Sequence, residues 1–384
     1  MKLPEGIKYI GVNDHDVDLF EGQYVVPNGM SYNSYLVCGE KIAVMDGVDG
    51  KKTDEWLTNI KNALGERKPD YLVVQHMEPD HSSSVKAFAD AYPEAIIVGN
   101  SKTFIMLAQY FEGLDLELRK LVVPDGGKLD LGGKELNFVF APMVHWPEVM
   151  MTYESTTKTL FSADGFGKFG ALDVDEDWAC EARRYYFGIV GKYGVQVQAV
   201  LKKASALEID TVCPLHGPVL SENLAYYIGL YDTWSSYRAE KEGVFIAYTS
   251  VYGNTKKAVY ALASELEAKG VKVSVTDLAR EDMAEAVEDA FKYDRLVLAT
   301  TTYNGEIFPF MRTFIDDLVE RGYKNRRVAF IENGSWAPVA TKVMMKKLEG
   351  CKNLTYAETN VTIRASVKKA DIETIKALAD ELAK

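Results

Sequence analysis

The segment YLVVQHMEPDHSSSV, residues 71–85, concentrates side chains that could bind metal ions. Within six positions it holds His76, Glu78, Asp80 and His81, whereas the whole chain of 384 residues contains only five histidines. Neutral imidazoles beside carboxylates are common ligands of borderline and hard metal ions. This segment alone does not distinguish a metal site from a polar surface loop.

The neighbouring residues indicate how this segment folds. YLVV is typical of a buried strand, and SSSV can begin a helix with a serine as its cap. Because Pro79 disfavours a regular helix through His76, we expect the residues between to form a loop at the carboxyl end of the strand. In such a loop one histidine–carboxylate pair, His76 and Glu78, can face away from the pair Asp80 and His81. That arrangement suits two metal ions.

Three further candidate ligands also follow strand-like segments. They are His145 in FAPMVHWPEV, Asp164 in LFSADGFG and His216 in TVCPLHGPV. A sandwich fold can gather such strand-end loops at one edge. Four of the five histidines therefore occupy strand ends, which favours a metal site over a polar loop. The fifth, His15 in NDHDVD, is expected to be solvated and to have no role.

The order H-x-E-x-D-H, followed by a distant His, Asp and His, resembles the ligand pattern of the flavodiiron proteins, whose first domain has the metallo-β-lactamase fold. Zinc hydrolases of that fold show H-x-H-x-D-H, and Glu78 stands here at the second histidine position. An extra carboxylate favours iron over zinc, although ligand type alone does not settle the metal. The resemblance implies two irons bridged by Asp164. The ligands of one would be His76, Glu78 and His145, and those of the other Asp80, His81 and His216.

Two domains are expected to position these residues. Residues 1–242 begin with alternating strand-like segments, continue with helical stretches near 52–64, 83–92 and 102–111, and return to β-rich sequence, which indicates an αββα sandwich. After the polar segment YDTWSSYRAEKEG, five strand-like runs alternate with helical patterns across residues 243–384. This alternation predicts a doubly wound, mostly parallel, five-stranded sheet, and the expected fold class is α/β.

The second half also contains a candidate phosphate site. YTSVYGNTKKAV, residues 248–259, presents hydroxyls and backbone amides where a helix should begin. It lacks the G-K-[ST] of a Walker loop and resembles the phosphate loop of flavodoxins. TTTYNGEIFP and ENGSWAP resemble the two other flavin loops of that fold. A serine- and threonine-rich turn that only caps a helix is the alternative explanation for the first loop.

The resemblance assigns thirteen residues to cofactor binding: Ser250, Tyr252, Gly253, Asn254, Thr255, Thr302, Tyr303, Asn304, Gly305, Asn333, Gly334, Ser335 and Trp336. Tyr303 and Trp336 are candidates to pack on a flat ring, with ordinary packing at the sheet edge as the alternative. Loops at the carboxyl ends of an open parallel sheet converge where such folds bind ligands. FMN is favoured over FAD or NAD because the chain has no G-x-G-x-x-G with a downstream ribose-binding acid.

Composition limits the partners and the location. The net charge is −12 and no basic stretch occurs, so nucleic acid is not an expected partner. No apolar run reaches membrane-spanning length and the N-terminus lacks the apolar core of a signal peptide, so a cytoplasmic protein without a membrane association is expected. The four cysteines form no C-x-x-C pair, which argues against a disulfide framework and a fused rubredoxin module.

The resemblance also implies a function. Flavodiiron proteins reduce O2 to water, NO to N2O, or both, with electrons that pass from FMN to the diiron centre. A homodimer or homotetramer is implied, with a separate rubredoxin or similar small protein as electron donor, or a deazaflavin donor. Tyr193 is a candidate catalytic residue that lines the substrate pocket, although packing at a helix end fits it equally. VVPNGMSYN lacks the histidine that some members carry there, so this stretch does not distinguish O2 from NO.

Two other functions are compatible with parts of the sequence. The first domain could be a zinc hydrolase fused to a flavodoxin with another use, although Glu78 and the three flavin loops weigh against it. Alternatively, the chain could be an electron carrier whose first domain binds no metal, although the complete set of seven candidate ligands weighs against that.

Overall fold

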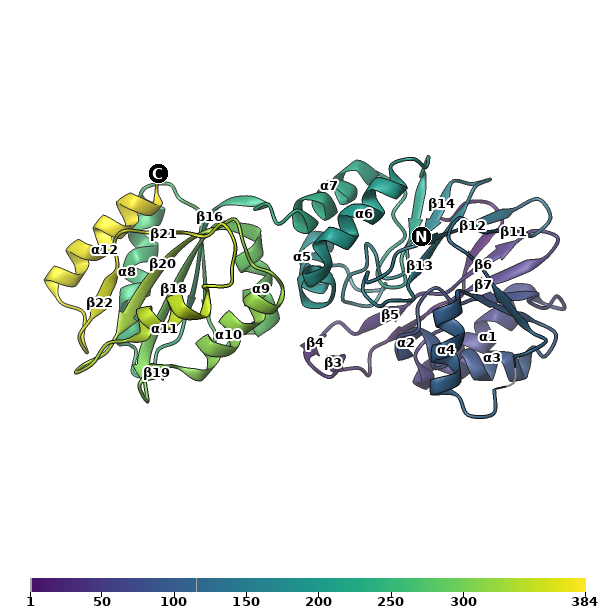
Figure 1. Cartoon of the computed structure of the whole chain (residues 1–384), viewed down its shortest axis with the longest axis horizontal. Coiled ribbons are helices and arrows are strands. Elements are labelled where there is room, and N and C mark those ends of the chain that lie inside the picture. Colours follow the sequence, from purple (N-terminus) through teal and green to yellow (C-terminus); the bar gives the residue numbers. More distant parts are fainter. Residues whose placement is uncertain (1, 115) are drawn as a thin grey trace. The chain divides into compact units, whose positions relative to one another are not determined.

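The structure, a computed structural model, describes residues 2–114 and 116–384, and the chain divides into two compact units (Figure 1). The first unit runs to Tyr186 and includes Val195–Asp232, and the second comprises Phe187–Gly194 and Thr233–Lys384. The boundary expected after residue 242 falls inside strand β16 (Lys241–Tyr248).

The first unit contains two large sheets. The first has the order β1-β6-β7-β8-β9-β10 and the second β11-β12-β13-β14-β15. The bounds in the first are β1 (Ile7–Tyr9), β6 (Tyr35–Cys38), β7 (Ile42–Met45), β8 (Tyr71–Val73), β9 (Ile96–Gly99) and β10 (Lys120–Val122). Those in the second are β11 (Lys128–Asp130), β12 (Glu135–Phe140), β13 (Met150–Glu154), β14 (Thr159–Phe161) and β15 (Thr211–Cys213). Two small ribbons pair β2 (Val12–Asp14) with β5 (Met30–Tyr32) and β3 (Leu19–Phe20) with β4 (Tyr24–Val25).

A shared apolar core joins the two sheets. Val37 and Val73 of the first sheet belong to the same buried cluster as Phe138 and Phe161 of the second. Every residue of β7 and β8 is buried, as expected for central strands covered on both faces.

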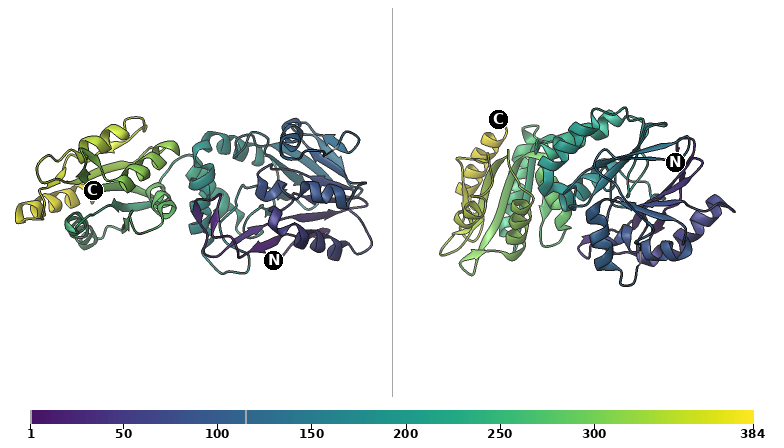
Figure 2. Two further views of the ribbon diagram at one scale, coloured as in Figure 1. Left: turned by 90° about the horizontal axis from the view of Figure 1, so that it is seen from below. Right: turned by 45° about the vertical axis from the view of Figure 1, so that its right-hand side comes forward.

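Helices flank the two sheets, as an αββα sandwich requires (Figure 2). They are α1 (Thr53–Leu64), α2 (Pro79–Ser82), α3 (Val85–Ala91), α4 (Ser101–Tyr110), α5 (Trp178–Tyr185), α6 (Gly194–Ala204) and α7 (Leu224–Ser235). The helices predicted near 52–64, 83–92 and 102–111 are thus confirmed as α1, α3 and α4. Helix α1 buries Trp56, whose ring lies 5.8 Å from that of Phe88 on α3.

The second unit is a doubly wound sheet of order β17-β16-β18-β20-β21. Its strands are β16, β17 (Val273–Asp277), β18 (Tyr293–Tyr303), β19 (Glu306–Ile307), β20 (Arg327–Asn333), β21 (Thr355–Tyr356) and β22 (Val361–Ile363). Its helices are α8 (Asn254–Ala268), α9 (Met283–Lys292), α10 (Pro309–Glu320), α11 (Ala340–Lys347) and α12 (Lys369–Leu382). The expected parallel sheet is confirmed, but its fifth strand is divided into β21 and β22, which pair with opposite ends of β20. Strand β19 adds a short antiparallel pair to β18.

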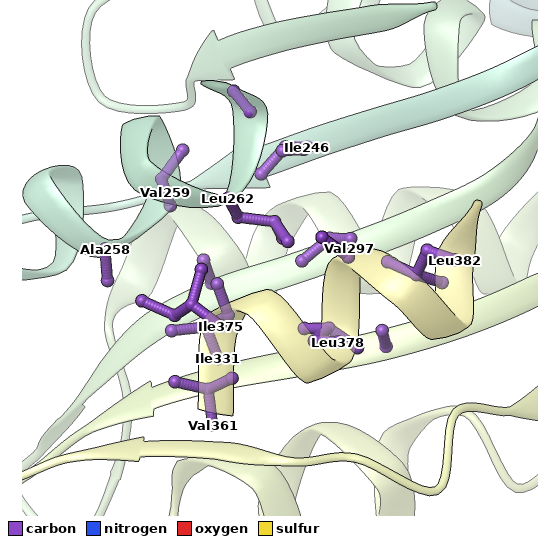
Figure 3. Close-up of a cluster of buried hydrophobic side chains, with 14 of the residues drawn as sticks. Ile246, Ala258, Val259, Leu262, Val297, Ile331, Val361, Ile375, Leu378 and Leu382 are labelled. Carbon is purple, nitrogen blue, oxygen red and sulfur yellow. The ribbon is translucent and has the colours of Figure 1, made fainter. Parts of the chain in front are cut away.

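One face of this sheet carries the cluster of buried side chains in Figure 3. Leu262 of α8 and Leu378 of α12 pack over Ile246, Val297 and Ile331, which lie on three neighbouring strands. Apolar residues spaced three or four positions apart give each helix the stripe that this packing needs. Among the described residues, no helix has the length and apolar character needed to cross a bilayer.

Glu381 anchors α12 to the rest of the second unit. Its carboxylate accepts hydrogen bonds from the backbone N–H groups of Glu358 and Thr359 and from Nη2 of Arg327, at 2.7 to 3.0 Å. Burial opposes the charge, but these donors outweigh it and lower the pKa of Glu381 to about 2. The carboxylate therefore stabilises the fold fully above its unfolded pKa of about 4.3, and this contribution disappears as the pH falls toward 2.

We expect Glu381→Gln to lower the free energy of unfolding at pH 7 by about 1–2 kcal/mol, because a charge-assisted hydrogen-bond group is lost. The difference from the wild type should shrink between pH 4.5 and pH 2, where the wild-type carboxylate loses its advantage. Urea titration of the whole chain, with amide exchange in α12 as the local readout, measures both effects. Glu373→Gln is the matched control, since this α12 side chain is 74% exposed. A deficit that persists unchanged at low pH would contradict the assignment to the charge.

Candidate metal centre and cofactor pocket

The first four candidate ligands follow strand β8 directly. His76 and Glu78 lie in the loop after it, whereas Asp80 and His81 lie in helix α2. The predicted loop is thus wrong for the last two residues. The helix begins at Pro79, because the fixed φ and missing N–H of proline suit the first helical position.

The other three candidate ligands come from the second sheet. His145 follows β12, Asp164 follows β14 and His216 follows β15. All seven residues are buried, with His76 and His216 fully inaccessible to solvent. The prediction that strand-end loops gather these side chains in one place is confirmed.

The seven side chains form two groups, each with ligand atoms within 4.8 Å of one another. In the first group, Nε2 of His76 lies 3.3 Å from Nε2 of His145, and each of these nitrogens is within 3.2 Å of Oε2 of Glu78. In the second group, Nε2 of His81 lies 3.1 Å from Nε2 of His216. Oδ2 of Asp80 lies 3.3 and 3.2 Å from these two nitrogens.

Asp164 lies between the two groups. Its Oδ2 is 3.1 Å from Nε2 of His145, and its Oδ1 is 3.3 Å from Nε2 of His81. One carboxylate thus offers a different oxygen to each group, as a bridging ligand would.

The donor set fits two metal cations. Pairs of imidazole nitrogens face each other at about 3 Å, and lone pairs so placed need a proton or a metal ion between them. Both carboxylate oxygens of Asp80 and Oδ1 of Asp164 are buried without a hydrogen-bond partner among the described residues. Buried carboxylates without donors are costly unless a cation compensates them.

The electrostatics of the cluster agree with this fit. Burial opposes charge on the histidines, but Asp164 holds the pKa of His76 well above its ordinary value, and Asp164 and Glu78 raise the pKa of His145 to about 9. Burial also opposes charge on the carboxylates, but the neighbouring histidines lower the pKa values of Asp164 and Glu78 below those of ordinary carboxyl groups. Metal ions can replace the protons that the histidines hold and supply the same positive charge.

A cavity of about 220 Å³ reaches this cluster and is lined by Phe20, Tyr32, Glu78 and Asp80, among others. Glu21, at the turn between β3 and β4, also lines it and has a left-handed φ of 48°. The residue as a whole is exposed, but its carboxyl group is enclosed beside Glu78. Burial and the charge of Glu78 raise the pKa of Glu21 to about 7.

Sequence reasoning missed the residues that support the cluster from outside. Tyr185 is fully buried with its ring 5.5 Å from that of His216, and burial together with the nearby Asp164 holds its pKa well above the usual range. Glu148 contacts Nδ1 of His76 at 2.8 Å. The acid that directly follows the WP of HWPE was the available signal for Glu148.

The remaining predicted residues of the first half, Tyr193 and His15, do not belong to either ligand group. Tyr193 ends a short 3-10 helix, Gly191–Tyr193, in the segment that groups with the second unit, and it is half-buried. Its catalytic role stays a prediction. His15 has a side chain 52% exposed and contacts Asp173 at 3.1 Å, so its predicted solvation is confirmed.

The second unit contains a pocket of about 500 Å³ at the carboxyl ends of its strands. Eleven of the thirteen predicted cofactor-binding residues line it: Ser250, Tyr252, Asn254, Thr255, Thr302, Asn304, Gly305, Asn333, Gly334, Ser335 and Trp336. Gly253 precedes α8 with a left-handed φ of 84°, and Tyr303 contacts Phe308; neither is among the lining residues. The lining also includes Ala365, from the loop after β22, which the sequence did not indicate.

The pocket fits a flat phosphorylated ligand. Its size lies within the ordinary range for small-molecule sites. Hydroxyls of Ser250 and Thr255 stand at the N-terminus of α8, where backbone N–H groups favour a phosphate. Tyr252 and Trp336 are more than 90% exposed, which is unusual for aromatic rings and leaves their faces available to a ring system.

Comparisons with known proteins cover both units. Residues 30–217 match the ODP family beta lactamase model, and residues 245–361 match the flavodoxin domain model. The nitric oxide reductase of Moorella thermoacetica is 28% identical over 99% of this chain and 97% of its own. The anaerobic nitric oxide reductase flavorubredoxin of Escherichia coli is 28% identical over 90% of this chain and 74% of its own. The crystal structure of the flavodiiron protein from Giardia intestinalis superposes with a TM-score of 0.91 at 25% identity, covering 99% of this chain and 95% of that one.

We expect Asp164→Asn to reduce the bound metal of the whole protein from about two ions per chain to fewer than one. The asparagine amide keeps the shape of the aspartate side chain but removes its negative charge, which lies between the two ligand groups. The buried imidazoles on either side then lack the anion that favours a metal cation between them. Metal content after gel filtration measures the loss. Asp173→Asn, which changes an exposed carboxylate, should keep both ions. Retention of two ions by Asp164→Asn would show that this carboxylate does not bridge them.

Proposed function

The chain belongs to the flavodiiron proteins, and on this premise we propose that it reduces O2 to water, NO to N2O, or both, at a non-haem diiron site with electrons passed from FMN. It is an oxidoreductase. The observation that carries the proposal is the arrangement of seven buried ligands in two groups that share Asp164. When bound, FMN supplies electrons singly or in pairs and the two irons supply a place for the gas to be reduced.

We propose a division of the ligands between the two irons. His76, Glu78 and His145 hold one iron, and Asp80, His81 and His216 hold the other. Asp164 bridges them. The contacts of 3.0 to 3.3 Å within each group support this division.

The residues around the cluster hold its side chains in place and limit the access of water. Ser31 accepts from Nδ1 of His216 through its backbone oxygen at 2.7 Å, so Nε2 is directed at the second group. The ring of Phe20 packs edge-on against His216 at 5.4 Å. The cavity of about 220 Å³ is large enough for a diatomic gas and lies beside Glu78 and Asp80, one from each group.

We propose that residues 243–384 form the FMN-binding domain and residues 1–242 the diiron domain. The thirteen residues assigned to the flavin divide among three loops. Hydroxyls and backbone N–H groups around Ser250 and Thr255 hold the phosphate, and Trp336 packs on the ring. Tyr303, which does not line the pocket itself but adjoins the lining residues Thr302 and Asn304, is the second candidate to pack on the ring. The clustering of eleven of these residues around one pocket supports this assignment.

Partners and location complete the proposal. A rubredoxin-type protein is the electron donor, in keeping with the name of the flavorubredoxin relative, and a deazaflavin donor is the alternative. The chain forms a homodimer or homotetramer in the cytoplasm. Exposed rings beside the pocket, Tyr252 and Trp336, support a partner surface on that side of the second unit. A protein that is monomeric in sedimentation experiments and fully active would contradict the oligomer.

The central experiment uses chemically reduced protein under anaerobic conditions. One sample is mixed with O2 and an identical sample with NO, and flavin reoxidation and products are recorded. Rapid reoxidation by O2 with water as product, or by NO with N2O as product, supports the proposal. Slow reaction with both gases would overturn it, and zinc instead of iron on metal analysis would favour the hydrolase alternative.

His81→Ala should lose iron from the second group and lower turnover with both gases by about 100-fold or more, because one of the four side chains proposed to bind that iron is removed. FMN content should stay at the wild-type level, since His81 lies in the other unit from the pocket. Iron analysis and flavin absorbance on the same sample measure both quantities. His15→Ala is the control, as this exposed histidine lies outside both groups. Wild-type iron and turnover in His81→Ala would show that the proposed ligand division is wrong.

Thr255→Ala should have the opposite effect to His81→Ala, with weaker FMN binding and unchanged iron content. Loss of one hydroxyl that faces the phosphate should weaken FMN binding by about tenfold, the equivalent of about 1.4 kcal/mol, and leave the iron content unchanged. Quenching of FMN fluorescence on titration with the apoprotein gives the dissociation constant. Thr374→Ala, which changes a half-buried threonine on α12 outside the pocket lining, is the matched control. Equal FMN affinity in the wild type and Thr255→Ala would remove Thr255 from the phosphate site.

A further inference from the structure

Glu148 lies outside the two ligand groups but contacts His76 of the first group, at the ring nitrogen that faces away from the other ligands. Its Oε1 is 2.8 Å from Nδ1 of His76 and also accepts the backbone N–H of Met77 at 2.8 Å. The residue is 1% exposed, and its backbone oxygen accepts a hydrogen bond from Asn100, the residue that caps α4. Oε1 of Glu148 is therefore positioned by two contacts, whereas Oε2 is buried without a hydrogen-bond partner among the described residues.

This contact determines how His76 presents its ring. When Nδ1–H donates to a carboxylate, the lone pair is on Nε2, which is the form that binds a metal ion. Nε2 of His76 faces the first group, 3.2 Å from Glu78 and 3.3 Å from His145. Glu148 thus fixes both the orientation and the tautomer of one ligand.

The second group has weaker outer support. Nδ1 of His216 contacts a neutral backbone oxygen, that of Ser31, at 2.7 Å, and Nδ1 of His81 has no hydrogen-bond partner among the described residues. Asp46 is a buried carboxylate whose charge acts on His81. However, it makes its hydrogen bonds to Gln75 and to the backbone of His76, not to a ligand ring.

We propose that Glu148 makes the two metal sites unequal, so that the group of His76, Glu78 and His145 holds its metal ion more tightly than the group of Asp80, His81 and His216. The inference rests on the metal centre of the proposed function. A carboxylate behind a ligating imidazole increases the basicity of the ring and adds negative charge near the cation, and such outer contacts change metal affinity by about 10–100-fold. Glu148 is therefore a positioning residue, and the two ions load and leave in sequence.

The test follows the release of iron from the full-length holoprotein into excess chelator under anaerobic conditions. The wild type should lose one iron per chain at least tenfold faster than the other. Glu148→Gln keeps the shape and the acceptor oxygen but removes the charge, so it should accelerate the slower phase by about 10–100-fold. Glu154→Gln is the matched control, because Glu154 is a fully buried carboxylate in the same unit that contacts no ligand ring. It accepts from the backbone N–H groups of Thr156 and Thr157 and from the hydroxyl of Thr157, and it pairs with Nζ of Lys134 at 3.5 Å. Its release kinetics should equal those of the wild type.

A second pair of variants identifies the site that each phase reports. In a His81→Ala background the remaining iron is in the first group, so adding Glu148→Gln should accelerate its release. In a His145→Ala background the remaining iron is in the second group, and adding Glu148→Gln should have no effect. Flavin content and the urea midpoint of each variant, which Glu148→Gln should leave unchanged, separate this local effect from a loss of folding.

Glu148→Asp tests whether the charge or the packing of Glu148 slows iron release. If the charge is responsible, this variant should release iron more slowly than Glu148→Gln, although its side chain is shorter. Faster release from Glu148→Asp than from Glu148→Gln would assign the effect to packing and overturn the inference. Release of both irons from the wild type in one phase would also overturn it, whereas a wild type that binds no iron would contradict the proposed function itself.

Discussion

The burial of four imidazoles and three carboxylates beside one another is the constraint on which the first unit depends. An uncompensated buried charge costs several kcal/mol, so this cluster is stable only when positive charge accompanies the carboxylates. Protonated histidines are one source of that charge, since Asp164 and Glu78 raise the pKa of His145 against the effect of burial. Metal ions provide it in a fixed geometry, which makes metal binding and the order of this region two aspects of one equilibrium.

A sandwich of two sheets satisfies this constraint because the apolar core between the sheets is separate from the strand-end loops that carry the charged side chains. The shared core around Val73, Phe138 and Phe161 includes no carboxylate, imidazole or basic side chain among its buried members, and it fixes the directions of the strands. Loops at the ends of those strands then carry the ligands inward from both sheets. The short helix α2 adds one refinement, since a single helical turn after Pro79 directs Asp80 and His81 to a different group from the residues just before it.

Residue types and spacing were sufficient to predict the fold class and the proximity of the seven candidate ligands, because strand-end loops in a layered fold lie at a common edge of the sheets. They did not predict what depends on three-dimensional neighbours. Glu148 and Tyr185 are distant in sequence from the histidines that they contact, and no spacing links Glu148 to His76 although Glu148 lies within the segment FAPMVHWPEV. The divided fifth strand escaped prediction because its weakly apolar residues pair at two separate places along β20. Tertiary pairing decides such cases, not local propensity.

The two units differ in how they can stabilise a charged ligand. In the metal cluster, negative carboxylates require positive protons or metal ions beside them, so the assembly of the cluster depends on these cations. The pocket of the second unit has no charged side chain among its lining residues, and a phosphate there would be bound by hydroxyls and by the backbone N–H groups that start α8. Dipoles of this kind are present in the folded chain before any ligand arrives. A flavin bound in this pocket would therefore meet donors that are already in place, whereas the metal cluster would reach its final charge balance only when metal binds.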